Sequence, residues 1–210
     1  MNGKLKVIGA ALATLVLSGC ASMSSDECVT ADWNAVGYED GVRGYTTERF
    51  SNHRKACAKH GVTPSFADYK AGREQGLVEY CQPGRGFDVG ASGGRYYGVC
   101  SVNLEPDFLD AYNVGHHLYV LRSNVNGASS EISSKENEIQ RVDEEIREKE
   151  ALLIARETSI EERVLLLADL KDLSERTGTL EAEIEHLYEE RARHRVELEN
   201  YQASLVGYGY

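Results

Sequence analysis

Two long stretches of the sequence repeat apolar residues every seven positions, and this pattern constrains the fold more than any other feature. The first row runs from Ala111 to Leu153, and the second runs from Leu166 to Tyr201. Heptad repeats sustained over this length predict coiled-coil helices. The two rows are in different registers, so the chain must turn or slip between them.

The segment Thr158-Ser159 is where we expect the chain to turn, because Ser159 and Glu162 have the spacing of a capping box. A tight turn there would give two antiparallel arms, from about residue 112 to 157 and from 160 to 205. The alternative is a single long helix that slips register near Thr177-Gly178 and pairs with a second chain. We favour the hairpin.

The first 19 residues have the composition of an export signal. Two lysines precede an apolar run from Val7 to Leu17, which is too short for a permanent membrane-spanning helix. The run ends at Leu17-Ser18-Gly19-Cys20, which resembles the lipobox of bacterial lipoproteins. The resemblance implies cleavage before Cys20, a lipid on its thiol and membrane attachment through that lipid. In lipoproteins of Gram-negative bacteria an Asp directly after the lipidated cysteine tends to retain the protein at the inner membrane. This chain has Ala21 there, which resembles the default for the outer membrane, on its periplasmic face.

Four cysteines remain after Cys20, and an even number in an exported chain indicates two disulfides. Three pairings are open. Two predicted helices, over about 26–44 and 47–59, would lie antiparallel across a short turn and would bring Cys28 close to Cys57. We therefore favour Cys28–Cys57, which leaves Cys81–Cys100 to close a glycine-rich stretch.

The sequence thus predicts a mostly α-helical protein in four parts. These parts are a signal peptide over 1–19, a tether over 20–25, a disulfide-stapled helical domain over 26–106 and a coiled-coil helical hairpin over 107–206. Within the stapled domain, glycines between Cys81 and Cys100 predict a loop or a small β-hairpin.

Acidic residues outnumber basic ones, 34 against 23, giving a formal charge of −11. Nucleic acids and anionic lipid surfaces require a positive field, so neither is expected as the main partner. The predicted partners are the membrane, through the lipid on Cys20, and either another envelope protein or a second copy, through the coiled coil.

The motif Tyr-x-x-Gly occurs three times, beginning at Tyr38, Tyr69 and Tyr112. On a helix the tyrosine and the glycine share a face, so the simplest interpretation is close packing of crossing helices. The alternative is a ligand pocket formed by aromatic and basic side chains: Trp33, Tyr38, Tyr69, Arg73 and Tyr112.

Few residue patterns indicate catalysis or metal binding. His53, Cys57 and His60 could share a helix face, but we expect Cys57 to be in a disulfide. The cysteines lack C-x-x-C spacing, the glycine-rich stretch lacks a P-loop ending, and no G-x-S-x-G motif occurs. We therefore expect no metal, no cofactor and no enzymatic activity.

Several motifs together resemble those of a known family of bacterial lipoproteins, domain of unknown function 2799. They are Ala-Asp-Trp-x-x-x-Gly-x-x-Asp-Gly from Ala31, Cys57 with Gly61-Val62-x-Pro64, Tyr69-x-x-Gly-Arg with Tyr80-Cys81, and Tyr97-Gly98-Val99-Cys100. The resemblance covers about residues 28–122. The resemblance supports the predicted disulfides and the predicted location in the cell envelope. It also implies a helical C-terminal extension but no catalytic residues.

These observations favour a non-enzymatic structural or protein-interaction component of the cell envelope. The alternative is a module that binds a small ligand or a cell-wall fragment through the Tyr-x-x-Gly helices.

Overall fold

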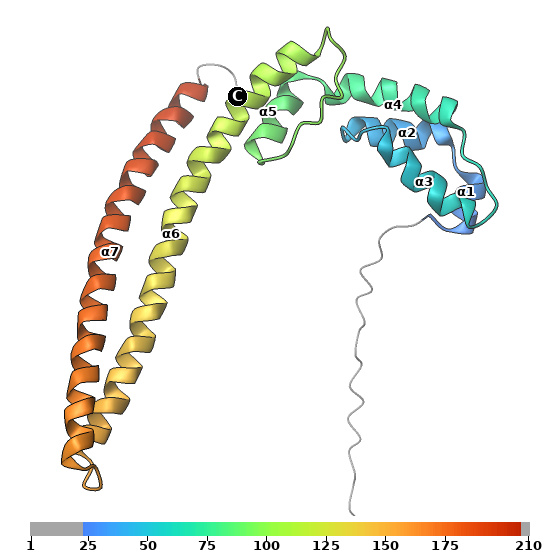
Figure 1. Ribbon diagram of the computed structural model, residues 1–210. Helices are drawn as coiled ribbons and strands as arrows, with labels where there is room; N and C mark the ends of the chain where they lie inside the picture. Colours follow the sequence, from blue (N-terminus) through green and yellow to red (C-terminus); the bar gives the residue numbers. More distant parts are fainter. Residues whose placement is uncertain (1–22, 207–210) are drawn as a thin grey trace, which may run out of the picture. The chain divides into compact units, whose positions relative to one another are not determined.

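A computed structural model describes residues 23–206 of the chain, and this part contains seven helices and no strand (Figure 1). The predicted signal peptide 1–19 and lipidation site Cys20 lie outside the described residues. The chain divides into two compact units, one ending at Gly76 and the other beginning at Leu77. The predicted fold class, a disulfide-containing helical domain followed by a helical hairpin, is confirmed.

The first unit contains α1 (Ser25–Thr30), α2 (Trp33–Val42), α3 (Glu48–Ala58) and most of α4 (Phe66–Tyr80). The single helix predicted over 26–44 is in fact two. Asp32 interrupts it because its carboxylate accepts hydrogen bonds from the backbone N–H groups of Asn34 (2.9 Å) and Ala35 (3.2 Å), and thereby starts α2.

The Cys28–Cys57 disulfide joins α1 to the end of α3, as the antiparallel arrangement predicted. Both cysteines are buried with Trp33, Phe50 and Tyr69 in the core of this unit. The Phe50 ring lies 4.9 Å from the Tyr69 ring, centroid to centroid, so aromatic side chains from three helices fill the space beside the disulfide.

The second unit begins at the end of α4 and continues into α5 (Pro83–Ala91), a helix where the sequence predicts a glycine-rich loop or small hairpin. Pro83 suits the first helical turn. Gly86 and Gly90 share one face and are buried against α6. Tertiary packing thus overrides the low helix propensity of glycine. The Cys81–Cys100 disulfide closes this segment, as predicted.

Helices α6 (Glu105–Ile154) and α7 (Ile160–Val206) run side by side as a hairpin (Figure 1). The predicted seam is confirmed, since its buried positions include Leu118, Ile132 and Val142 on α6 and Leu180 and Leu187 on α7. The α6 helix passes through Gly127 unbroken. Because α6 ends at Ile154 and α7 begins at Ile160, the alternative of one long helix slipping near Thr177-Gly178 is wrong for this structure.

Polar pairs fix the register of this seam. Lys135 and Lys149, which interrupt the apolar rows, each form a salt bridge across it, to Glu183 (2.5 Å) and Asp169 (2.7 Å). The hydrogen bond from Lys135 to Glu183 raises the pKa of the lysine. A slip of one helical turn would separate both pairs, so they favour a single alignment of α6 and α7.

The two units repeat one arrangement of cysteines and glycines. In each, a glycine follows the first cysteine of the disulfide by nine residues, and a Tyr-x-x-Gly motif follows the second cysteine, with its glycine fifteen residues on. The corresponding residues are Cys28 and Cys81, Gly37 and Gly90, Cys57 and Cys100, Tyr69 and Tyr112, and Gly72 and Gly115.

The repeated glycines make the same backbone contacts. A Cβ atom added to Gly37 would lie 2.0 Å from the carbonyl oxygen of Tyr69, and one added to Gly90 would lie 2.1 Å from that of Tyr112. Both distances are far inside van der Waals contact. Each unit is therefore built on a crossing of two helices whose backbones touch, α2 with α4 and α5 with α6.

Candidate interaction surface

The turn between α6 and α7 is held by side chains that bind the last carbonyl groups of α6. The Thr158 hydroxyl donates to the Leu152 carbonyl at 2.7 Å. The Arg163 guanidinium donates to the carbonyls of Leu153, Ala155 and Thr158. Carbonyl groups at the end of a helix have few partners within the helix, so these side-chain hydrogen bonds help to order the turn.

Helix α7 begins with the predicted capping box. The Ser159 backbone N–H donates to the Glu162 carboxylate at 2.8 Å, and the Glu162 N–H donates to the Ser159 hydroxyl at 3.2 Å. Hydrogen bonds from the Ser159 backbone and hydroxyl lower the pKa of Glu162. Two side chains thus fix the direction in which α7 leaves the turn.

Six large aliphatic side chains around this turn are exposed, and we call them the tip patch. Each has between 55 and 81 % of its surface accessible: Leu152, Ile154, Ile160, Val164, Leu165 and Leu167. In the described structure, residues 122–151 and 168–187 expose no large apolar side chain. Exposed apolar residues therefore concentrate at the turn and are absent from the adjoining shaft.

The tip patch borders a groove of about 470 Å³ beside the turn. Leu152, Leu165 and Leu166 supply its apolar wall, and Thr158, Glu162 and Asp169 supply polar groups at its margin. Exposed apolar side chains beside a groove with polar margins are typical of protein interaction sites.

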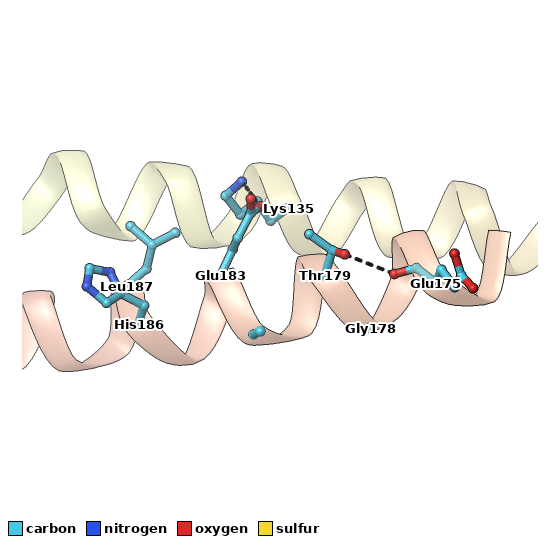
Figure 2. Close-up of a pocket in the computed structure, with 8 residues that line it drawn as sticks. Lys135, Glu175, Gly178, Thr179, Glu183, His186 and Leu187 are labelled. Carbon is cyan, nitrogen blue, oxygen red and sulfur yellow. Dashed lines mark hydrogen bonds and ion pairs between the residues drawn. The ribbon is translucent and has the colours of Figure 1, made fainter. Parts of the chain in front are cut away.

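A second, larger depression of about 880 Å³ lies on the shaft beside Gly178, a position at which α7 has no side chain (Figure 2). Its wall contains the Lys135–Glu183 salt bridge, and the Thr179 hydroxyl donates to the Glu175 carbonyl. These polar groups bind one another, and the depression is shallow and open. It has the character of a solvated helix surface.

The residues predicted as a ligand pocket are largely buried in the cores. Trp33, Tyr69 and Arg73 lie in the first unit, where Trp33 and Tyr69 belong to the aromatic core. Arg73 is 8 % exposed, and its Nε donates to the Tyr45 carbonyl at 2.8 Å. Tyr38 is half-buried, and its backbone nitrogen packs closely on Gly72.

Tyr112, the remaining predicted pocket residue, belongs to the second unit. Its hydroxyl donates to the Gly94 carbonyl at 3.0 Å, and its ring packs near Tyr96 and Phe108. Trp33, Tyr69, Arg73 and Tyr112 thus contact residues of their own unit, and the glycines of all three Tyr-x-x-Gly motifs lie where helix backbones touch.

A buried polar cluster in the first unit was missed by the sequence reasoning. Asp40 is 5 % exposed, and one carboxylate oxygen lies 2.9 Å from the Tyr69 hydroxyl, which donates to it, and 2.8 Å from the His53 Nε2. Burial, together with the charge of Asp40, raises the pKa of Tyr69. The side chain of Arg49 lies 3.8 Å from the other oxygen. This cluster ties α2, α3 and α4 together.

The tip patch was also missed, although the sequence carries a signal for it. Ile154, Ile160, Val164 and Leu165 are apolar but lie off the heptad positions, so the seam cannot bury them. Apolar residues outside the seam, gathered on both sides of a predicted turn, would have indicated an exposed surface there.

The part of the chain that the structure describes contains no cluster of three or more His, Cys, Asp or Glu side chains arranged to hold a metal ion. Cys57, which the sequence placed beside His53 and His60, is in a disulfide. No described helix has the length and hydropathy needed to cross a membrane.

Comparison with known proteins finds one family. Neither curated proteins nor solved structures give a match. The model of a family described as a protein of unknown function, DUF2799, matches residues 32–117, which include both helix crossings and the Cys81–Cys100 disulfide. Over these residues the chain is similar to the DUF2799 family.

Proposed function

We propose that this protein is a lipid-anchored component of the bacterial cell envelope that binds another protein through the tip of its α6–α7 hairpin. The lipobox-like segment ending at Cys20 supports the anchor, and the lack of Asp after it favours the periplasmic face of the outer membrane. The observation that carries the binding role is the tip patch.

The exposed surface of the tip patch is a source of binding free energy. Fully burying one aliphatic side chain contributes about 1.5–3 kcal/mol, and six such side chains are more than half exposed. A partner that covered them would gain several kcal/mol, against the cost of about 4–15 kcal/mol for association and ordering. The turn is already held by Thr158 and Arg163, so little of that cost falls on the tip itself.

The geometry of the arm suits this role. A helix of 50 residues extends about 75 Å, and α7 returns along it, so the turn lies at the end of the hairpin away from α5 (Figure 1). A protein tethered by a lipid at Cys20 can act only within reach of its membrane, and a long arm extends that reach. The role is non-enzymatic, because it needs shape and apolar area but no reactive group.

Site-specific photo-crosslinking in living cells tests the proposal. A photoreactive amino acid is placed at Ile154 or Leu165 in the tip, or at the exposed Glu181 on the shaft as a control. We expect a discrete protein adduct from the two tip positions and none from Glu181. Equal adducts at all three positions, or none at the tip, would contradict the binding role.

The anchor is tested separately. Replacing the proposed lipidated residue, Cys20→Ser, should move the protein from the membrane fraction to the soluble fraction and abolish labelling by a palmitate analogue. Retention in the membrane without label would show that another feature holds it there.

A further inference from the structure

The charges around the tip patch are unbalanced. Three exposed acids, Glu150, Glu157 and Glu161, form no ion pair among the described residues, and Arg156 is the one exposed basic residue between residues 150 and 167. Arg163 is engaged with the carbonyl groups at the end of α6. The border of the patch is therefore acidic.

An acidic border selects among the surfaces that could cover the patch. An anionic lipid surface would be repelled by it. A second copy docked tip to tip would place Glu157 and Glu161 of each chain in one symmetric interface, opposite the same acids. A protein groove with apolar walls and Lys or Arg at its edges complements both the patch and its border.

The shape of the tip supports an inserted mode of binding. The turn is short. Hydrogen bonds that Thr158 and Arg163 donate, and one that the Ser159 hydroxyl accepts from the Glu162 N–H, hold its backbone. A preorganised projection loses little conformational entropy when it enters a groove. A flexible loop with the same residues would lose far more.

We propose that the hairpin tip inserts into an apolar groove of a different protein, a groove bordered by lysine or arginine side chains. This inference rests on the proposed binding role of the tip and adds the chemistry of the partner. Leu152, Ile154 and Leu165 would enter the groove, and Glu157 and Glu161 would face its basic edges.

Charge reversal at the tip, within the full chain in living cells, tests the inference. The photoreactive residue is kept at position 154, and Glu157→Lys with Glu161→Lys is compared with a matched double reversal on the shaft, Glu181→Lys with Glu185→Lys. All four positions are exposed. We expect the tip reversal to reduce the adduct roughly tenfold and the shaft reversal to leave it unchanged. Circular dichroism of each purified variant shows whether the helices are intact.

The outcomes separate this inference from the proposed function. An adduct that survives tip reversal would show that the tip binds a protein but that its acids do not select the partner, which would overturn the inference alone. An adduct with a second copy, identified by its mass, or with lipid would also overturn it. Complete absence of a tip adduct in the unreversed protein would contradict both.

A purified system gives a second measurement. The probe is an amphipathic helical peptide of leucine and lysine, with a leucine and glutamate peptide as control. We expect the lysine peptide to bind the full chain, with affinity reduced roughly tenfold by the tip reversal but unchanged by the shaft reversal. Equal weakening by both reversals would show attraction to net charge alone and would overturn the inference.

Discussion

The two helix crossings have the same backbone contacts but different surroundings. In the first unit, Tyr69 donates its hydroxyl to the buried carboxylate of Asp40, whereas Tyr112, its counterpart in the second, donates to the Gly94 carbonyl. The crossing helix also differs in length, since α4 has 15 residues and α6 has 50. What the two units share is a disulfide and a helix crossing in which the two backbones touch.

The comparison distinguishes residues that hold the fold together from residues that are available for function. Features that both units contain, the glycines and the disulfides, are explained by packing. Each unit also has a feature that the other lacks: the first has the Asp40 cluster, and the second has the hairpin arm. The arm ends in apolar side chains that are more than half exposed, so the second unit is where we place the interaction with a partner.

Removing each disulfide should have the largest effect on stability. The two disulfides span 29 and 19 residues, and the chain-entropy model assigns each about 3–4 kcal/mol, with slightly more for the longer span. We expect Cys28→Ser with Cys57→Ser to destabilise the first unit and Cys81→Ser with Cys100→Ser the second, as measured by hydrogen exchange of peptides from each unit. If either pair of substitutions reduced the protection of peptides from both units, the two units would not unfold independently.

Adding a methyl group at a crossing should cost about 3 kcal/mol. The added Cβ would lie 1.8 Å from the Asn34 carbonyl oxygen in Gly72→Ala and 2.2 Å from the Phe87 carbonyl oxygen in Gly115→Ala. The helices must then move apart. Gly127→Ala is the control, since no atom lies within 4 Å, and it should stabilise α6 by up to about 1 kcal/mol. Urea unfolding measures all three, and similar changes at the three sites would contradict the repeated crossing.

Removing the counterpart tyrosine hydroxyls should distinguish the two units. Tyr69→Phe removes a donor from a buried carboxylate and should cost about 2 kcal/mol, whereas Tyr112→Phe removes a bond to a neutral carbonyl and should cost about 1 kcal/mol. Unfolding free energies from urea titration measure the difference. A larger cost for Tyr112→Phe would show that the Asp40 cluster contributes little.

High pH should weaken the second unit through Tyr96. Burial, assisted by the hydrogen bond to Glu105, raises the pKa of Tyr96 to about 12, above the value near 10 of an unfolded chain. The folded state thus holds this proton more tightly. The resulting stability is complete below about pH 10 and is lost as the pH rises toward 12. Melting temperatures between pH 9 and 11.5 should fall less steeply in Tyr96→Phe, and identical slopes would exclude this role.

The sequence predicts the parts of this fold that depend on local or periodic patterns. The seam follows from heptads such as Leu118 and Leu180, and the turn follows from Ser159 and Glu162, because caps are encoded within a few residues. The Cys28–Cys57 pair follows from helix direction, once the helices are predicted.

The remainder depends on contacts between distant residues. Gly86 and Gly90 indicate a loop until α6 is known to lie against them, so α5 was not predicted. Asp40 and His53 are 13 positions apart and come from different helices, so their contact has no local signature. Ile154 is different, because its place off the heptad positions and beside the predicted turn is visible in the sequence, and the structure adds the extent of its exposure.

The proposed binding role depends on a hairpin in which α6 and α7 of one chain present the tip. A carbodiimide joins a lysine amine directly to a neighbouring carboxylate, so it can link Lys135 to Glu183 and Lys149 to Asp169. Protein labelled with ¹⁵N is mixed with unlabelled protein, unfolded, refolded and then crosslinked. We expect both linked peptide pairs to carry one isotope only. Pairs with one light and one heavy peptide would show that the helices come from two chains, and would contradict the hairpin.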